Sequence, residues 1–190
     1  PLVLERIDGV DGVMVVQRQR LPAALLAYLV VEGARPVPRA ILAELLWGEE
    51  SPESARASLR QAIHALRKLL GEDALVGERA EVVLAPGRVA SDHASFVAAV
   101  VAGDMQEALH WYRGPFCDQI DLRSASLFER WVDAERERLR RLLLRSAGRE
   151  VDARRASGDL KGSARLAGAV QSVEATLPQA TELFADALIA

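Results

Sequence analysis

The chain has 190 residues, half of them hydrophobic, and a net charge of −3. A chain of this length can bury the core of one large domain or two small ones, and its slight negative charge excludes a protein that holds nucleic acid through overall basicity. The single cysteine excludes an intramolecular disulfide, and without a membrane-spanning run or a signal peptide we expect a cytoplasmic protein with no membrane partner.

The first part of the chain predicts short strands and two helices. Residues 2–7 and 13–17 have the pattern of short strands around two Asp-Gly turns. A helix is expected over 21–31, and Pro38 opens a second helix that ends at Gly48. The core candidates of these two helices are Leu25, Leu26, Tyr28, Leu29, Val30, Ile41, Leu42, Leu45, Leu46 and Trp47.

A third helix, over residues 51–71, has clear start and stop signals and two different faces. Ser51 can cap it, Pro52 suits its first position, and Gly71 suits the position after its last turn. With successive residues about 100° apart, one face is apolar and is expected to pack. That face consists of Ala55, Leu59, Ala62, Ile63, Leu66 and Leu70. The opposite face, here called the donor face, consists of Arg56, Arg60, Gln61, His64, Arg67 and Lys68.

The donor face suggests contact with DNA. No acid interrupts it, although residues 1–94 as a whole contain 11 lysines and arginines against 13 acids. Arg and Gln read guanine and adenine edges in the major groove, and Lys and Arg neutralise phosphates. For an isolated helix a solvated face is the commoner explanation. The following residues favour DNA, because 75–76 and 81–84 predict a hairpin and complete the order of a winged helix-turn-helix.

Beyond residue 91 the pattern predicts helices alone. They are expected at 94–101, 104–112, 125–156, 160–173 and 178–190. Residues 102–108 and 157–164 resemble each other, since in both a Gly-Asp pair precedes a helix, as in tetratricopeptide-like repeats. The sequence thus predicts a mainly α fold with small β hairpins. A winged helix-turn-helix DNA-binding domain is expected over 1–91 and an all-α tetratricopeptide-like helical repeat domain over 92–190.

The longest predicted helix also has a packing side and a charged side. Its packing residues are expected to be Phe128, Trp131, Leu139, Leu142 and Leu143. Its charged residues, which include Glu135, are most simply a solvated face with Glu-to-Arg pairs such as Glu137 and Arg141. Trp47, Trp111 and Trp131 have apolar neighbours, so we expect them in the core and not as a platform for stacked bases.

Three blocks of sequence resemble the bacterial transcriptional activator domain (BTAD) proteins of the antibiotic-regulatory SARP or AfsR-like family, which carry an OmpR-type winged helix. They are residues 25–71, residues 102–120 with the run Tyr-Arg-Gly-Pro-Phe, and residues 131–144. The resemblance implies a transcriptional activator that binds direct-repeat operators in double-stranded DNA, assists RNA polymerase and forms a homodimer on DNA. It also places the donor face where the family presents its DNA-facing side.

The predicted hairpin departs from the family pattern. Many members have a Gly-rich or aromatic, often basic, hairpin, whereas here Arg79 stands between Glu78 and Glu81. Arg79 is nevertheless included among the predicted DNA-binding residues. Members are often joined to ATPase domains, but this sequence lacks Gly-x-x-x-x-Gly-Lys-Ser/Thr, so a nucleotide site would lie outside it. We expect a fragment of a larger regulator or a compact member.

An enzyme is not expected. His64, His93 and His110 are isolated, and neither a metal-binding spacing nor a nucleophile elbow is present. We therefore predict no catalytic residue, no metal and no cofactor, and Cys117 fits a part-buried structural thiol. The main alternative is a tetratricopeptide-like protein-interaction scaffold or sensory module whose winged helix mediates protein contacts. The uninterrupted donor face favours DNA.

Overall fold

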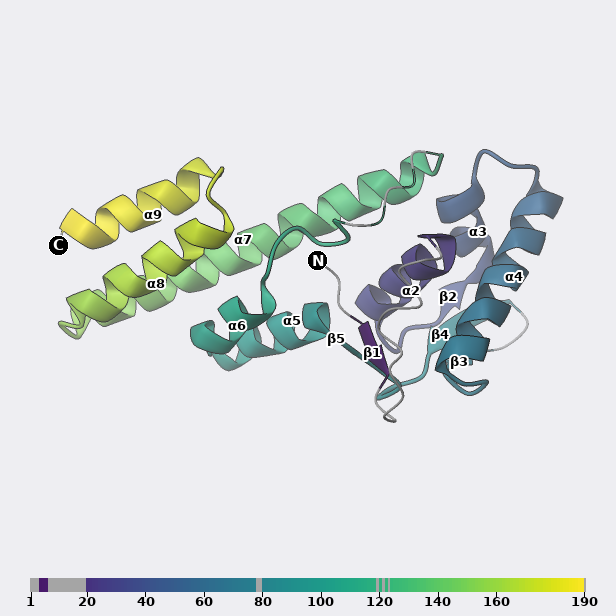
Figure 1. The fold of residues 1–190 in the computed structure, drawn as a ribbon, viewed down its shortest axis with the longest axis horizontal. Helices are drawn as coiled ribbons and strands as arrows, with labels where there is room; N and C mark the ends of the chain where they lie inside the picture. Colours follow the sequence, from purple (N-terminus) through teal and green to yellow (C-terminus); the bar gives the residue numbers. More distant parts are fainter. Residues whose placement is uncertain are drawn as a thin grey trace. The chain divides into compact units, whose positions relative to one another are not determined.

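The computed structural model describes residues 4–6, 20–77, 80–118, 120, 122 and 124–189 (Figure 1). The chain divides into two compact units. The first contains Pro1–Ala94 and Phe116–Ala134, and the second contains Ser95–Pro115 and Glu135–Ala190. Each unit is defined by packing and consists of two separate segments of the chain. This division does not test the predicted domain boundary between residues 91 and 92, which stays a prediction.

Three helices build the core of the first unit: α2 (Arg20–Glu32), α3 (Arg39–Trp47) and α4 (Pro52–Leu70). Most of the predicted core residues of α2 and α3 are buried. Ile41 is an exception, because 48% of its surface is exposed. It precedes the fully buried Leu42, and one residue turns a helix by about 100°, which takes Ile41 off the packed face.

The predicted hairpin is present beside these helices. Strands β3 (Leu75–Val76) and β4 (Glu81–Leu84) are antiparallel, with Leu75 opposite Leu84. Strand β2 (Val37–Pro38) pairs with the other edge of β4, which gives a small sheet in the order β2-β4-β3. Its buried side carries Leu75, Val82 and Leu84 toward the helical core.

A second small sheet joins distant parts of the chain. Strand β1 (Leu4–Arg6) pairs antiparallel with β5 (Val89–Ser91). The strand predicted over 2–7 is thus present in its described part, whereas the one predicted over 13–17 lies outside the described residues. Strand β5 was not predicted, because three residues are too few for an alternation of apolar and polar positions.

The remaining elements are helical, as predicted. They are α5 (Asp92–Ala102), α6 (Met105–Trp111), α7 (Ser126–Ala156), α8 (Leu160–Val173) and α9 (Pro178–Ile189). The predicted fold class, mainly α with small β hairpins and with a winged helix-turn-helix ahead of a helical domain, is therefore confirmed. In the part of the chain that the structure describes, no helix combines the length and the apolar character needed to cross a membrane.

The two Gly-Asp pairs make the same turn. The N–H of Asp104 donates to the carbonyl of Ala99 at 2.9 Å, and the N–H of Asp159 donates to that of Arg154 at 2.8 Å. Both glycines have a positive φ, 77° at Gly103 and 83° at Gly158. These are the features of a Schellman motif. Each Asp side chain then caps the next helix by accepting a backbone N–H at 2.9 Å.

A buried polar cluster ties helices of the second unit together. The hydroxyl of Tyr112, the residue after α6, donates to the carboxylate of Glu174, the residue after α8. The other carboxylate oxygen of Glu174 accepts from Nε of Arg140 in α7 at 3.2 Å. Tyr112 and Glu174 are buried, so these hydrogen bonds replace the water that their polar atoms lose on folding.

The charged side of α7 is only partly the solvated face expected from the sequence. The predicted pair of Glu137 and Arg141 is present, at 3.4 Å. The expectation is wrong for Glu135, which is 6% exposed. Glu135 tolerates burial because Arg138, one helical turn later, donates to both of its carboxylate oxygens at 2.6 and 2.8 Å.

Candidate nucleic-acid interface

Helix α4 begins and ends at the residues that its sequence indicates. The Ser51 hydroxyl oxygen accepts the backbone N–H of Ser54 at 3.3 Å, and Pro52 occupies the first turn. At the other end Gly71 adopts a φ of 102°, and its N–H donates to the carbonyl of Arg67 at 2.8 Å. These local signals fix the helix and hence the directions of its side chains.

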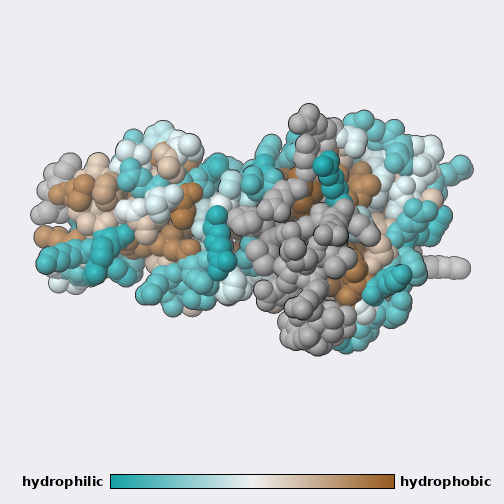
Figure 2. All heavy atoms as spheres, in the orientation of Figure 1, coloured by the Kyte–Doolittle hydropathy of each residue, from teal (hydrophilic) through white to brown (hydrophobic). Residues whose placement is uncertain are grey.

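The two predicted faces of α4 have opposite burial. All the residues of the apolar face are buried, with Leu59 and Leu66 at 2% and 0% exposure. Of the donor face, Arg56, Arg60, Gln61, His64 and Lys68 are exposed and Arg67 is half-buried. Figure 2 shows mostly hydrophilic residues on the visible side of α4. The helix therefore packs with one side and presents hydrogen-bond donors with the other.

Arg67 differs from the rest of the donor face, because its side chain contacts the hairpin. Its Nε and Nη2 donate to the carbonyl oxygen of Leu75 at 3.2 and 2.8 Å. Leu75 is buried and lies in β3. Two of the three guanidinium nitrogens thus hold the hairpin against α4, while the predicted phosphate contact of Arg67 stays a prediction.

No acid of the described residues neutralises the donor face. The ion pairs of the first unit include Arg35 with Glu32 at 3.3 Å and Arg88 with Asp73. Neither pair contains a residue of the donor face. Glu50 lies just before α4, where its carboxylate accepts the hydroxyl of Ser54 at 2.5 Å, and within the described residues it forms no ion pair with the donor face. The positive charges of the donor face therefore remain available to an outside anion.

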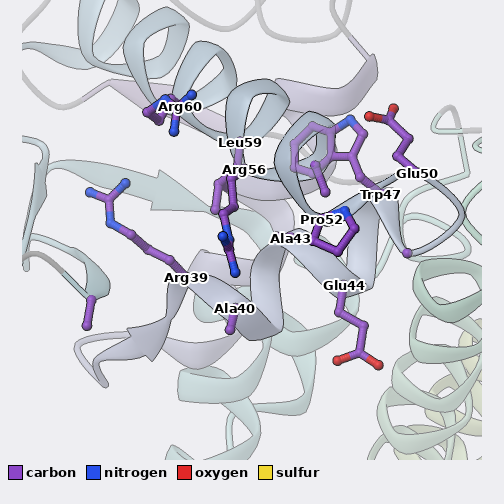
Figure 3. Close-up of a pocket in the computed structure, with 13 residues that line it drawn as sticks. Arg39, Ala40, Ala43, Glu44, Trp47, Glu50, Pro52, Arg56, Leu59 and Arg60 are labelled. Atoms are coloured by element: carbon purple, nitrogen blue, oxygen red, sulfur yellow. The ribbon is translucent and has the colours of Figure 1, made fainter.

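A groove of about 830 Å³ lies between α3 and α4. Its wall includes the apolar residues Ala43, Trp47, Ala55 and Leu59. Figure 3 shows its charged residues separated, with Arg39, Arg56 and Arg60 toward one end and Glu44 and Glu50 toward the other. The donor face therefore continues into the groove through two of its arginines.

Arg39 was not predicted as a site residue. The sequence places it at the start of the second helix, next to Pro38, and gives no sign that it approaches α4. Arg79 lies outside the described residues. Within those that are described, no three His, Cys, Asp or Glu side chains come together to hold a metal ion.

Comparisons with known proteins are consistent with this geometry. Residues 16–86 match the family "Transcriptional regulatory protein, C terminal". The chain is 32% identical over 146 residues to the transcriptional regulatory protein EmbR of Mycobacterium tuberculosis, a match that covers 66% of this chain and 37% of EmbR. It is 36% identical over 69 residues to the regulatory protein AfsR of Streptomyces griseus, covering 36% of this chain and 7% of AfsR.

A solved structure shows the same fold. The structure of M. tuberculosis EmbR in complex with a low-affinity phosphopeptide aligns with 98% of this chain and 65% of that chain, at a TM-score of 0.55 and 24% identity. The chain thus spans well under half the length of EmbR in the sequence match and about two thirds of the chain in the solved structure.

Proposed function

We propose that the donor face of α4 binds double-stranded DNA in the major groove. The resemblance of the chain to the AfsR-like transcriptional regulators supports this proposal. One observation carries this proposal. The apolar face of α4 is buried, while the opposite face leaves Arg, Gln, His and Lys side chains exposed with no acid among them. Such a helix can be held rigidly by its domain and still offer donors to base edges and phosphates.

The residues of the donor face have different proposed roles. Arg60 and Gln61 are exposed near the middle of α4, where they can donate to base edges. Lys68 is exposed in the last turn and contacts a phosphate. Arg67 supports the hairpin through Leu75 and has fewer nitrogens left for a phosphate.

A single recognition helix reads few base pairs, so we propose that two copies bind neighbouring half-sites. On a direct repeat the copies stand head to tail, because the two half-sites are related by translation along the duplex. We further propose that DNA-bound copies activate transcription by assisting RNA polymerase, as the AfsR-like resemblance implies.

The test uses the full chain and duplexes chosen by selection from random DNA. We expect the selected sites to contain a direct repeat, and the full chain to bind two half-sites more tightly than the product of the single-site affinities predicts. Fluorescence anisotropy on duplexes with one half-site, two half-sites and two half-sites in inverted orientation measures this. Equal binding to direct and inverted repeats would contradict the head-to-tail arrangement, and no selected sequence at all would contradict sequence-specific DNA binding.

A second candidate function is protein binding by the second unit. Its helices expose Val101, Leu160 and Leu188, which are 82%, 44% and 61% exposed. Single exposed hydrophobic residues are common on protein surfaces, and only a contiguous patch of them indicates an interaction site. A chain that fails to select DNA, but whose Val101→Ser and Leu188→Ser variants lose a copurifying protein, would favour this candidate.

A further inference from the structure

The start of α3 is held next to the hairpin. The backbone N–H of Arg39, the first residue of α3, donates to the carbonyl of Ala80 at 2.8 Å. Strand β2, which directly precedes α3, also pairs with β4 through Val37 and Val82. The position of Arg39 is therefore fixed by backbone contacts and does not depend on its side chain.

The side chain of Arg39 has a donor without an acceptor. Its Nε is buried, and no acceptor in the described part of the chain lies within hydrogen-bonding range. Buried donors without a partner are uncommon in native proteins. Arg39 is one of the residues that line the groove between α3 and α4 (Figure 3).

Two arginines of α4 line the groove with Arg39. Arg56 and Arg60 lie one helical turn apart and are shown toward the same end of the groove (Figure 3). No acid of the described residues pairs with any of these three side chains, and Glu50 toward the other end accepts the hydroxyl of Ser54. Guanidinium groups that two elements contribute to the same groove suit an anion with several oxygen atoms, such as the phosphates of a nucleic-acid strand.

We propose that Arg39 is a DNA-backbone contact that forms, with Arg56 and Arg60, one phosphate subsite at the arginine end of the groove. This inference rests on the proposed function of α4 and adds a residue from a second helix to it. A DNA strand is favoured over an acidic protein segment, because Arg56 and Arg60 also belong to the donor face, which continues along α4 to Lys68. One extended polyanion can reach both places.

The subsite also accounts for the unusual hairpin sequence. Arg79 stands between Glu78 and Glu81, a poor composition for contact with phosphates. Arg39 is bonded through its backbone to Ala80, one residue before Glu81. It therefore supplies positive charge on the hairpin side of α4, where the hairpin's own sequence supplies little.

The test compares the salt dependence of DNA binding by the full chain and three variants. Arg39→Gln should reduce the slope of log K against log salt by about one, since one phosphate contact is lost. Arg39→Gln should lower the affinity for the selected site and for unrelated duplex by the same factor, because a phosphate contact carries no sequence information. Arg39→Lys should restore the slope, since an ammonium group also neutralises a phosphate.

Arg35→Gln is the matched control. Its side chain is 75% exposed and pairs with Glu32, away from the groove, so its slope should equal that of the wild type. Thermal unfolding of each variant shows whether the fold is retained, and the Arg39→Lys chain tests the charge if Arg39→Gln is unstable. A wild-type slope in Arg39→Gln overturns the subsite and leaves the groove to an acidic protein segment. A wild-type chain that binds no duplex overturns the proposed function, and the subsite with it.

Discussion

The guanidinium group of Arg67 donates two hydrogen bonds to the carbonyl oxygen of Leu75, from Nε at 3.2 Å and from Nη2 at 2.8 Å. This contact joins the helix that we propose to read DNA to the first strand of the hairpin. The neighbouring Lys68 is exposed, and no hydrogen bond joins it to the residues of the hairpin that the structure describes. Two adjacent basic residues of the donor face should therefore behave differently when they are replaced.

Arg67→Met should lower the free energy of unfolding by about 1–3 kcal/mol, because the buried carbonyl of Leu75 loses its side-chain donor. Lys68→Met should change it by less than about 0.5 kcal/mol, as exposed substitutions usually do. The salt slope of DNA binding should fall by about one in Lys68→Met. Urea unfolding and anisotropy titrations measure both quantities, and a larger stability loss in Lys68→Met would contradict these roles.

The first unit should need residues from beyond its predicted boundary. The Trp131 ring, in α7, lies 4.9 Å from that of Tyr28 in α2 and 5.8 Å from that of Phe116. We expect the fragment Pro1–Ser91 to melt at a lower temperature than the fragment Pro1–Ala134. Trp131→Ala in the longer fragment should remove much of that difference, with a loss of about 3 kcal/mol. Equal melting temperatures of the two fragments would refute this view of the unit.

Tyr112 should make the protein sensitive to alkaline pH. Burial, together with the hydrogen bond to the Glu174 carboxylate, raises the pKa of Tyr112 above its ordinary value near 10. The folded chain then keeps a proton that the unfolded chain releases. The stability contributed by Tyr112 is therefore complete below about pH 10 and declines as the pH rises further.

Tyr112→Phe should make that alkaline decline shallower. At neutral pH the same variant should be less stable by about 1–3 kcal/mol, because the buried Glu174 loses a donor. Urea unfolding at several pH values from 7 to about 11 separates the two effects. A decline as steep in Tyr112→Phe as in the wild type would assign the alkaline sensitivity to other groups.

Two glycines near the end of α7 should respond in opposite directions to alanine. Gly148 is helical, and a Cβ built on it meets no atom within 4 Å, so Gly148→Ala should stabilise the helix by about 0.5–1 kcal/mol. Gly158 has a φ of 83°, so Gly158→Ala should destabilise the turn by about 1–2 kcal/mol. Thermal unfolding of both variants measures this contrast. The same sign for both would show that the turn conformation contributes little.

The sequence predicts well those features that depend on neighbouring residues. The caps of α4, its two faces and the matching Gly-Asp turns all follow from periodicity and local hydrogen bonding. The periodic pattern places Leu59 and Leu66 inside and Arg60 outside, and the structure agrees.

Features set by distant parts of the chain were not predictable in the same way. Arg39 lines the same groove as two arginines of α4, and β2, which directly precedes it, is held by pairing with β4, a contact between residues more than forty positions apart. Glu135 is buried although the charge pattern of α7 favours exposure, because burial depends on how the helix packs and not on its own sequence, and the local pair with Arg138 makes that burial tolerable. The packing of Trp131 on Tyr28 likewise joins residues that no local pattern relates.

The most direct test of the DNA-binding account is the base preference of Arg60. The experiment titrates three proteins on the selected site and on duplexes with each base pair changed in turn. They are the full chain, its Arg60→Ala variant and a Lys161→Ala control, in which the replaced lysine is exposed and lies in α8. We predict that Arg60→Ala weakens binding to the selected site by about 1–3 kcal/mol and loses discrimination at one base pair, while Lys161→Ala matches the wild type. If Arg60→Ala retains both the affinity and the full base preference of the wild type, the donor face of α4 does not read DNA.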